Sequence, residues 1–340
     1  MDALCKSLLD WYSTCARDLP WRHDPTPYRV WISEIMLQQT RVEAVKEYYR
    51  RFLAELPDVR SLAETSEERL FKLWEGLGYY SRARNLHAAA KIIADAGKFP
   101  DTPEDLRALP GVGEYTAGAI ASIAFGLPEP SVDGNVLRVL SRLLGHTVER
   151  QEASAWLRPR YPAGKCSEFT QAWMELGATV CLPNGEPRCP ECPLAEFCAA
   201  LRDGTIAELP AKPPKKARTI QKKSVFLLSC GNQIALIRRP AKGVLAKMWG
   251  FPETSSPLTS EDAAKEYLTD SGLTVHSCRM LPDSKHIFTH LEWHMKNFHA
   301  QVADFPADAE AVTLQDALEQ YALPAAYRAI RDAIAGLNGD

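Results

Sequence analysis

Four cysteines near the middle of the chain have the spacing of a metal centre. Cys181, Cys189, Cys192 and Cys198 have seven, two and five residues between successive members. Four thiolates close together in sequence commonly hold zinc or an iron–sulfur cluster. Zinc sites often use two C-x2-C pairs and this segment has one, which favours a [4Fe–4S] cluster without excluding zinc. Because four protein ligands leave no open position for a substrate, such a centre would have a structural or electrostatic role.

Two carboxyl groups have sequence surroundings that could separate their pKa values. Glu34 lies in the apolar run that starts at Trp31, and helical spacing places it on one face with Trp31 and Gln38. Burial would raise the pKa of Glu34, whereas Asp133 stands just before a helical run, where backbone N–H groups would keep a carboxylate ionised. Such a pair can cleave a glycosidic bond. Taken singly, Glu34 could equally be a structural carboxyl paired with an arginine, and Asp133 a simple helix cap.

Two glycine-containing segments have features that suit contact with nucleic acid. The run LPGVGEYTAGAIASIAFG (109–126) places a Pro-Gly-x-Gly turn before a strongly helical stretch, and leucines ahead of it indicate a preceding helix. We therefore expect a helix–hairpin–helix whose exposed N–H groups can hold a phosphate. The run GLGYYSRARNL (76–86) carries aromatics and arginines after a glycine turn, which suits wedging between bases, although paired tyrosines usually belong to a core.

The elements that must position these residues differ between the two parts of the chain. Residues 1–208 show apolar residues at three-to-four spacing almost throughout, which predicts an all-α domain. The stretch LPAKPPKKARTIQKK (209–223) is rich in Pro and Lys and predicts an extended linker. Residues 224–340 combine a predicted β-hairpin around Gly231 and Asn232 with strand-like runs and two predicted helices, at 260–272 and 324–337, which is typical of a small α+β domain.

Charge is distributed unevenly among these three segments. Residues 1–208 carry 24 basic and 29 acidic residues, residues 224–340 carry 10 and 14, and residues 209–223 carry six basic residues and no acidic one. The net charges are therefore −5, −4 and +6, which sum to −3. A non-specific nucleic-acid binder usually has a basic domain. Any DNA contact should therefore depend on local geometry and on the basic linker.

The location expected from the sequence is cytoplasmic. No apolar run approaches the length of a membrane span, the first residues lack a signal-peptide pattern, and the odd count of nine cysteines argues against a secreted disulfide framework. We therefore expect no membrane partner, and association with the nucleoid if DNA is the substrate. We also expect a monomer.

Together these motifs resemble the helix–hairpin–helix DNA glycosylases with a [4Fe–4S] module, and within them the MutY-type adenine DNA glycosylases. The similar segments are LPWR (19–22), PYRVWISEIMLQQTRVEAV (27–45), LWEGLGYYSRARNLH (73–87), LPGVGEYTAGAI (109–120), VDGNVLRVL (132–140), QAWMELGATVC (171–181), the cysteine segment, MWGFPE (248–253) and FTHLEWH (288–294). The resemblance implies a helical glycosylase domain joined to a Nudix-like recognition domain.

The resemblance also implies a role for individual residues. Glu34 would protonate adenine at N7 and Asp133 would stabilise the oxocarbenium ion at C1′, supported by hydrogen bonds of Tyr115 and Asn135. The remaining implied contacts are an adenine pocket of Trp21, Arg22 and Gln171, duplex contacts of Gln39, Tyr79 and Arg82, a phosphate site at Gly111 and Gly113, and probing of 8-oxoguanine by Phe288, Thr289 and His290. Gln38 has no role assigned by the resemblance.

Four features refine or depart from the family pattern. Related glycosylase/lyases have lysine where Tyr115 stands, and tyrosine cannot form a Schiff base, so we expect a monofunctional enzyme. The family more often has serine than threonine at position 289, and six rather than seven residues between Cys181 and Cys189. The run KEYLTDSG (265–272) lacks the glutamates of a Nudix hydrolase at Thr269 and Asp270, so we expect recognition rather than pyrophosphate hydrolysis in the second domain.

The function expected from the sequence is excision of adenine opposite 8-oxoguanine or guanine in double-stranded DNA, by base flipping and acid-catalysed hydrolysis. Two alternatives remain open: a glycosylase/lyase for oxidised pyrimidines and a non-catalytic iron–sulfur DNA-binding protein. A nucleotide pyrophosphatase is a more distant possibility.

Overall fold

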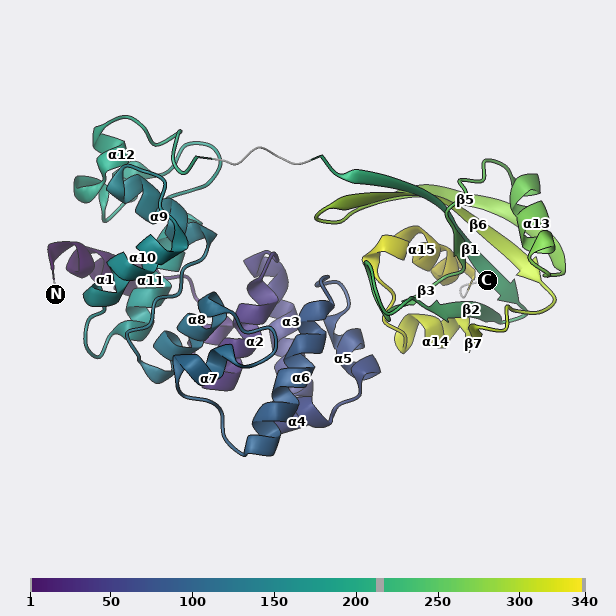
Figure 1. Cartoon of the computed structure of the whole chain (residues 1–340), viewed down its shortest axis with the longest axis horizontal. Helices are drawn as coiled ribbons and strands as arrows, with labels where there is room; N and C mark the ends of the chain where they lie inside the picture. Colours follow the sequence, from purple (N-terminus) through teal and green to yellow (C-terminus); the bar gives the residue numbers. More distant parts are fainter. Residues whose placement is uncertain (1, 212–216, 338–340) are drawn as a thin grey trace. The chain divides into compact units, whose positions relative to one another are not determined.

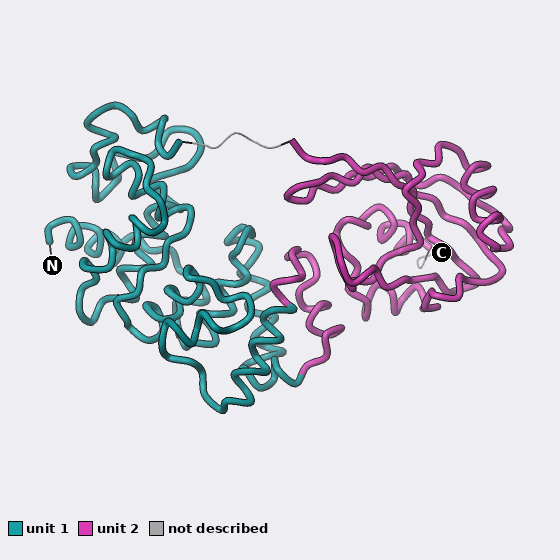
Figure 2. The backbone as a smooth tube through the Cα atoms, viewed as in Figure 1, with its two compact units in different colours: residues 1–64, 84–214 teal, residues 65–83, 215–340 magenta. Residues whose placement is uncertain are grey.

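The computed structural model describes residues 2–211 and 217–337, and its contacts divide the chain into two units (Figure 2). Unit 1 comprises residues 1–64 and 84–214, and unit 2 comprises residues 65–83 and 215–340. The segment 65–83 therefore groups with the C-terminal half. The predicted linker includes residues 212–216, which lie outside the described part, and the first strand begins within that prediction, at Thr219.

The chain is helical up to residue 211 and mixed after residue 217, as the sequence predicts (Figure 1). The helices of the first part are α1 (Ala3–Cys15), η1 (Pro20–Arg22), α2 (Pro27–Leu37), α3 (Val42–Glu55), α4 (Val59–Glu64), α5 (Glu67–Trp74), α6 (Ser81–Ala96), α7 (Pro103–Arg107), α8 (Glu114–Phe125), α9 (Gly134–Leu144), α10 (Arg150–Leu157), η2 (Arg158–Arg160), α11 (Cys166–Thr179), η3 (Cys189–Glu191), η4 (Ala195–Phe197) and α12 (Ala199–Arg202). The predicted helix–hairpin–helix is formed by α7, a turn and α8.

Local capping explains where the helices around the cavity begin. The Thr26 hydroxyl caps α2 by accepting from the N–H of Arg29, and the Asp133 carboxylate caps α9 by accepting from the N–H of Val136. Helices α8 and α9 both end at a left-handed glycine, which closes the last turn without a Cβ clash.

Unit 2 is built on one mixed sheet with helices on both faces (Figure 1). Besides α5, which belongs to it through the segment 65–83, its elements are β1 (Thr219–Cys230), β2 (Gln233–Arg238), β3 (Trp249–Gly250), β4 (Glu253–Thr254), α13 (Glu261–Asp270), β5 (Val275–Ile287), β6 (Leu291–Val302), β7 (Ala309–Thr313), α14 (Leu314–Glu319), η5 (Ala325–Tyr327) and α15 (Arg328–Leu337). The strand order is β3-β2-β1-β6-β5, with β4 beside β1 and β7 beside β2. Among the strand pairs within residues 217–337, only β1–β6 is parallel.

The hairpin predicted around Gly231 and Asn232 is the β1–β2 pair, and the helices predicted at 260–272 and 324–337 contain α13 and α15. The strand-like run 286–295 is broken, however, because residues 288–290 form the turn between β5 and β6. The N–H of Phe288 donates to the carbonyl of Leu291 across that turn.

The apolar cores follow the same division. A cluster in unit 1 joins α1, α9 and α11 through buried side chains such as Leu8, Leu140 and Trp173. In unit 2, α14 and α15 cover one sheet face and α13 covers part of the other. Across residues 2–211 and 217–337, no helix has both the length and the apolar character needed to cross a membrane.

Candidate active site

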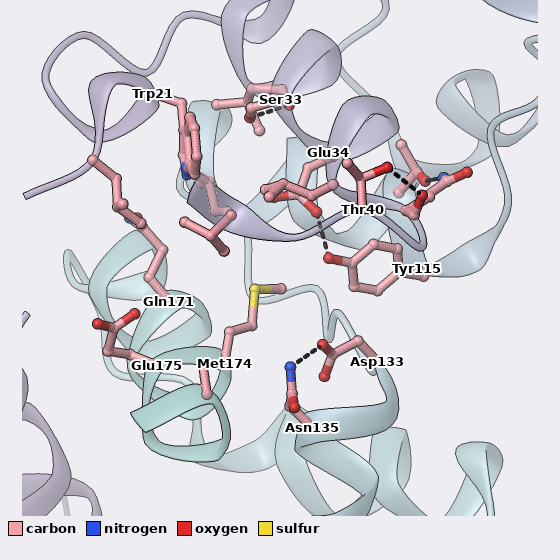
Figure 3. Close-up of a pocket in the computed structure, with 18 of the residues that line it drawn as sticks. Trp21, Ser33, Glu34, Thr40, Tyr115, Asp133, Asn135, Gln171, Met174 and Glu175 are labelled. Atoms are coloured by element: carbon pink, nitrogen blue, oxygen red, sulfur yellow. Dashed lines mark hydrogen bonds between the residues drawn. The ribbon is translucent and has the colours of Figure 1, made fainter. Parts of the chain in front are cut away.

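Unit 1 contains a cavity of about 630 Å³ lined by residues from η1, α2, α8, α9 and α11. Both candidate catalytic carboxyls lie in it: Glu34 enters from α2, and Asp133 enters from the start of α9 on the opposite side (Figure 3). A volume in this range accommodates a small organic group such as a nucleobase. The two residues are 99 positions apart in sequence, and the fold brings them to one site.

Glu34 is buried, and its carboxyl group accepts a hydrogen bond from a neighbouring helix. The hydroxyl of Tyr115 on α8 donates a short hydrogen bond to Glu34 Oε2. Burial raises the pKa of Glu34 to about 7, with a further rise from the Asp133 charge, while the Tyr115 hydrogen bond and Arg22 act in the opposite direction. The group can therefore hold a proton near neutral pH, as the sequence predicts.

Asp133 is held by donors on its own helix. Its Oδ1 accepts from the N–H of Val136 at 2.7 Å, and its Oδ2 accepts from Asn135 Nδ2 at 2.9 Å. Asn135 is held in turn by Arg138, whose NH2 group donates to Asn135 Oδ1 at 2.9 Å and to the Gly177 carbonyl at 2.7 Å. The orientation of Asp133 is thus fixed from two sides.

The charge state expected of Asp133 needs one correction. We expected the helix start alone to govern this carboxyl, but burial is the largest influence and raises its pKa above the usual value. The hydrogen bonds from Val136 and Asn135, together with Arg138, oppose that rise. The physical reason is depth: the carboxyl caps a helix that starts inside the cavity rather than at the surface.

The predicted adenine pocket forms one wall of the cavity. Trp21 is buried and packs edge-on against Tyr49, with ring centroids 5.6 Å apart, and Gln171 donates from Nε2 to Ser167 Oγ at 3.1 Å. Arg22 NH2 donates to Glu175 Oε2 at 2.8 Å. All three predicted pocket residues line the cavity.

Among the lining residues that were not anticipated from the sequence, three stand beside the predicted base pocket. Glu175 on α11 is fully buried, Arg17 joins it from the segment after α1, and the Met174 side chain points into the cavity (Figure 3). Glu175 and Met174 lie in the segment 171–181 that carries the family resemblance, but alternation of polar and apolar residues in a helix does not indicate which polar residue is buried.

The two glutamines that end α2 have different environments. Gln38 lines the cavity and donates from Nε2 to Thr116 Oγ1 at 3.4 Å, which links the end of α2 to α8. Gln39 is exposed and has a φ of +57°, in the left-handed region that residues other than glycine seldom adopt. Such strain often accompanies a functional side chain, so Gln39 remains a candidate for insertion into a duplex.

The helix–hairpin–helix turn depends on glycine at defined points. Gly111 has a φ of +76°, and a Cβ there would stand 2.7 Å from the Cβ of Asn85. Gly113 is exposed and forms the N-cap of α8, whose first N–H groups have no earlier carbonyl to bond. Farther along α8, a Cβ on Gly118 would stand 2.2 Å from the Pro130 carbonyl oxygen, so this glycine permits the approach of the segment that leads to Asp133.

The predicted DNA-contacting residues of unit 2 lie at the start of α6, on the loop before it and on the β5–β6 turn. Tyr79 has a φ of +48° and is 47% exposed, and its hydroxyl lies 3.2 Å from Thr289 Oγ1. Arg82 NH2 donates to the carbonyls of Leu77 and Gly78, at 2.9 Å and 3.1 Å, so part of its bonding capacity holds the Tyr79 loop in shape. Its burial lowers the pKa of Arg82 to about 10.

The β5–β6 turn carries the predicted 8-oxoguanine contacts. The ring of Phe288 packs edge-on against His286 and Trp293, with centroids 4.6 Å and 4.9 Å apart. Thr289 and His290 are exposed at the tip. Phe288 therefore anchors the turn and the two neighbours are accessible.

The four clustered cysteines line a small cavity of about 30 Å³ beside α9 and α11. Arg142 NH1 lies 3.3 Å from Cys181 Sγ and 2.9 Å from the Leu182 carbonyl, which ties this loop to α9. Within residues 2–211 and 217–337, no three His, Cys, Asp or Glu side chains converge closely enough to hold a single metal ion. The donor set of four thiols around one cavity nevertheless fits a metal cluster.

Comparison with known proteins supports this interpretation of both units. Residues 32–158 match the family model of the HhH-GPD superfamily of base excision DNA repair proteins, and residues 224–333 match that of the NUDIX domain. The structure of a thermostable thymine-DNA glycosylase superposes with a TM-score of 0.55 at 29% identity, covering 58% of this chain and 95% of that one. The fold and site thus define a helix–hairpin–helix base-excision repair protein.

Curated relatives narrow the class. The adenine DNA glycosylase of Mus musculus is 34% identical over 85% of this chain and 69% of its own length. That of Buchnera aphidicola subsp. Baizongia pistaciae is 33% identical over 84% of this chain and 82% of its own. The chain belongs to the adenine DNA glycosylase family, which confirms the resemblance stated from the sequence. It spans 55% of the length of the matching Arabidopsis thaliana protein.

Proposed function

We propose that this protein excises adenine paired with 8-oxoguanine or guanine from double-stranded DNA, as a monofunctional N-glycosyl hydrolase. The observation that carries the proposal is the pair of carboxyls across one cavity. Burial raises the pKa of Glu34 to about 7, and Val136 and Asn135 hold Asp133 by hydrogen bonds. Paired carboxyls with different environments are the usual means of cleaving a glycosidic bond. Family membership supports the same reaction.

In the proposed mechanism, the flipped adenine enters the cavity against Trp21, Arg22 and Gln171. Glu34 donates its proton to N7, the C1′–N9 bond breaks with its electron pair leaving on adenine, and the Asp133 carboxylate stabilises the positive sugar. Water then adds to C1′ and its proton returns to the Glu34 carboxylate. Because Tyr115 offers no amine, no Schiff base forms and the DNA strand remains uncut.

DNA contacts are assigned by the same proposal. Gln39 and Tyr79, both strained and exposed, enter the duplex, and the N–H groups after Gly111 and Gly113 hold a phosphate. The turn 288–290 reads the base opposite adenine. A monomer bound to DNA, at the nucleoid, is the form we expect to act.

We also propose that Cys181, Cys189, Cys192 and Cys198 hold a [4Fe–4S] cluster. When bound, the cluster would fix this loop and add local charge, and with four protein ligands it would take no part in the excision step. Measurement of iron, sulfide and zinc per chain distinguishes the cluster from a single zinc ion. Zinc without sulfide would contradict the assignment.

The decisive test of function is Glu34→Gln. The amide keeps the shape but cannot donate a carboxyl proton, so release of adenine from an A:8-oxoguanine duplex should fall by at least about a hundredfold, the usual worth of a general acid. Binding to the same duplex should persist. Retained turnover would contradict the assignment of Glu34 as acid.

Two assays separate the alternatives. A strong borohydride-trapped adduct would favour a glycosylase/lyase over a monofunctional enzyme. Binding without release of any base would favour a non-catalytic DNA-binding protein.

A further inference from the structure

A fully buried carboxylate in the wall of the cavity is not used by the proposed mechanism. The side chain of Glu175 on α11 has 0% exposure. Its Oε1 accepts from the backbone N–H of Arg17 at 3.1 Å and from Arg17 Nε at 2.7 Å. Its Oε2 accepts from Arg17 NH2 at 2.9 Å and from Arg22 NH2 at 2.8 Å. One carboxylate thus receives four hydrogen bonds from two arginines.

This arrangement is a closed cluster rather than an isolated ion pair. Arg22 NH1 donates to the Arg17 carbonyl at 2.8 Å, so the arginines are also joined to each other. Although burial favours protonation, the hydrogen bonds from Arg17 and Arg22 hold the pKa of Glu175 below its usual value. Burying a charge is unfavourable unless it is paired. The cluster therefore depends on Glu175 remaining charged.

The cluster also lies within electrostatic reach of the catalytic acid. The titratable and charged groups that act on Glu34 from the packed elements are Tyr115 of α8, Asp133 at the start of α9 and Arg22 of η1. Arg17, Arg150 and Glu175 also line the cavity. Among these, Arg22 favours the ionised form of Glu34, and Glu175 is the carboxylate that pairs with Arg22.

We propose that Glu175 is a positioning residue for excision. It holds Arg17 and Arg22 in the wall of the base pocket and neutralises Arg22, so that the positive charge does not strip the proton from Glu34. This inference rests on the proposed function. It assigns to Glu175 both an orienting and an electrostatic effect, and the second gives a measurable signature.

The test is the pH dependence of single-turnover adenine release from an A:8-oxoguanine duplex, with enzyme in excess. The rate of the wild type should fall as the pH rises through about 7, because Glu34 loses its proton. In Glu175→Gln, the unpaired Arg22 should move this fall to lower pH by about one unit, since a nearby opposite charge lowers a carboxyl pKa by 1–3 units. In Arg22→Gln, the fall should move to higher pH.

Two further variants separate this effect from a structural one. Glu175→Asp keeps the charge and should restore the wild-type position of the fall, even if the rate is reduced. Glu168→Gln makes the same change at an exposed position of α11 and should leave the profile unchanged. Because Glu34 makes stability fall as the pH rises, partial unfolding could also lower the rate at high pH. Thermal unfolding of each variant is therefore recorded at every pH of the profile, and rates are compared only where the variant is fully folded.

The outcomes are distinct. A Glu175→Gln profile that superimposes on the wild type after scaling would overturn the inference and leave the proposed function intact. If Glu175→Gln does not fold, the other two variants decide. The inference would be overturned if the rate of Arg22→Gln fell at the same pH as that of the wild type. It would be supported if the rate of Arg22→Gln fell at a higher pH and Glu175→Asp kept the wild-type profile. A wild type that releases no adenine at any pH would overturn the proposed function itself.

Discussion

A buried acid such as Glu34 makes the stability of unit 1 depend on pH. Its pKa rises from 4.5 to about 7 on folding. A carboxyl with a raised folded pKa contributes its full stability below the unfolded pKa, and this contribution is lost as the pH rises through the folded pKa. The side chain that we propose as the acid at neutral pH therefore lowers the free energy of unfolding at alkaline pH.

Relative to the wild type, Glu34→Gln should consequently be more stable at pH 8 than it is at pH 5. The amide does not ionise, so the difference in the free energy of unfolding between variant and wild type should grow by roughly 2–3 kcal/mol over that interval. Chemical denaturation at the two pH values measures it. Glu114→Gln, at an exposed position of α8, is the control and should show no such growth. A constant difference would mean that Glu34 is not desolvated as the structure indicates.

At the scale of elements, the crossing of α9 and α11 positions the proposed catalytic residues Asp133 and Asn135. A Cβ on Gly177 would stand 2.5 Å from the Cβ of Asn135 and 3.1 Å from its Cα. Asn135 donates to the Asp133 carboxylate. A change in the spacing of the two helices would therefore displace Asn135 and with it the hydrogen bond that orients Asp133. No helical periodicity in the sequence marks Gly177 for this contact.

Gly177→Ala should therefore reduce both stability and activity. Forcing an extra methyl into a packed helix crossing destabilises by about 1–3 kcal/mol, and displacement of Asn135 should lower the rate of excision. Thermal unfolding and single-turnover assays measure the two effects. The matched change Gly336→Ala lies at an exposed position of α15, where an added Cβ meets nothing within 4 Å. It should be neutral or slightly stabilising; equal losses in both variants would contradict the role of this crossing.

The sequence predicted which motif residues share the cavity better than it predicted the burial and backbone conformation of individual side chains. Glu34, Tyr115 and Asp133 belong to local patterns in which spacing carries information, and the structure places all three at one cavity. Glu175 was missed because its burial depends on Arg17, 158 residues away in sequence. Likewise, the strained backbone of Gln39 and the depth of Asp133 are tertiary effects with no local signature.

At the scale of the whole molecule, the two units have separate tasks in the proposed reaction. Unit 1 contains the carboxyl pair proposed to break the glycosidic bond. Unit 2 carries the turn with Thr289, whose hydroxyl lies beside that of Tyr79. Removing the Thr289 hydroxyl should then alter the choice of substrate more than the excision step. The preference for A:8-oxoguanine over A:G is the quantity that reports this division.

Thr289→Val removes the hydroxyl while retaining the shape, and Thr289→Ser retains the hydroxyl. The valine variant should lose several-fold of the A:8-oxoguanine preference, in line with one hydrogen bond of about 1 kcal/mol, whereas the serine variant should keep it. Release of adenine from both duplexes at matched enzyme concentrations gives the ratio. Equal ratios in all three proteins would show that this turn does not read the opposite base.

The packing of α1 has a consequence for how the chain is made. Ser7 donates to the Pro193 carbonyl at 2.8 Å, and Cys5, Leu8 and Leu9 share a core with residues of α9 and α11. During synthesis α1 is made well before these partners, because α9 begins only at Gly134 and Pro193 follows Ser7 by 186 positions. Contacts so distant in sequence form slowly. The apolar face of α1 can therefore be buried only after α9 and α11 have been synthesised, so unit 1 cannot fold strictly in chain order.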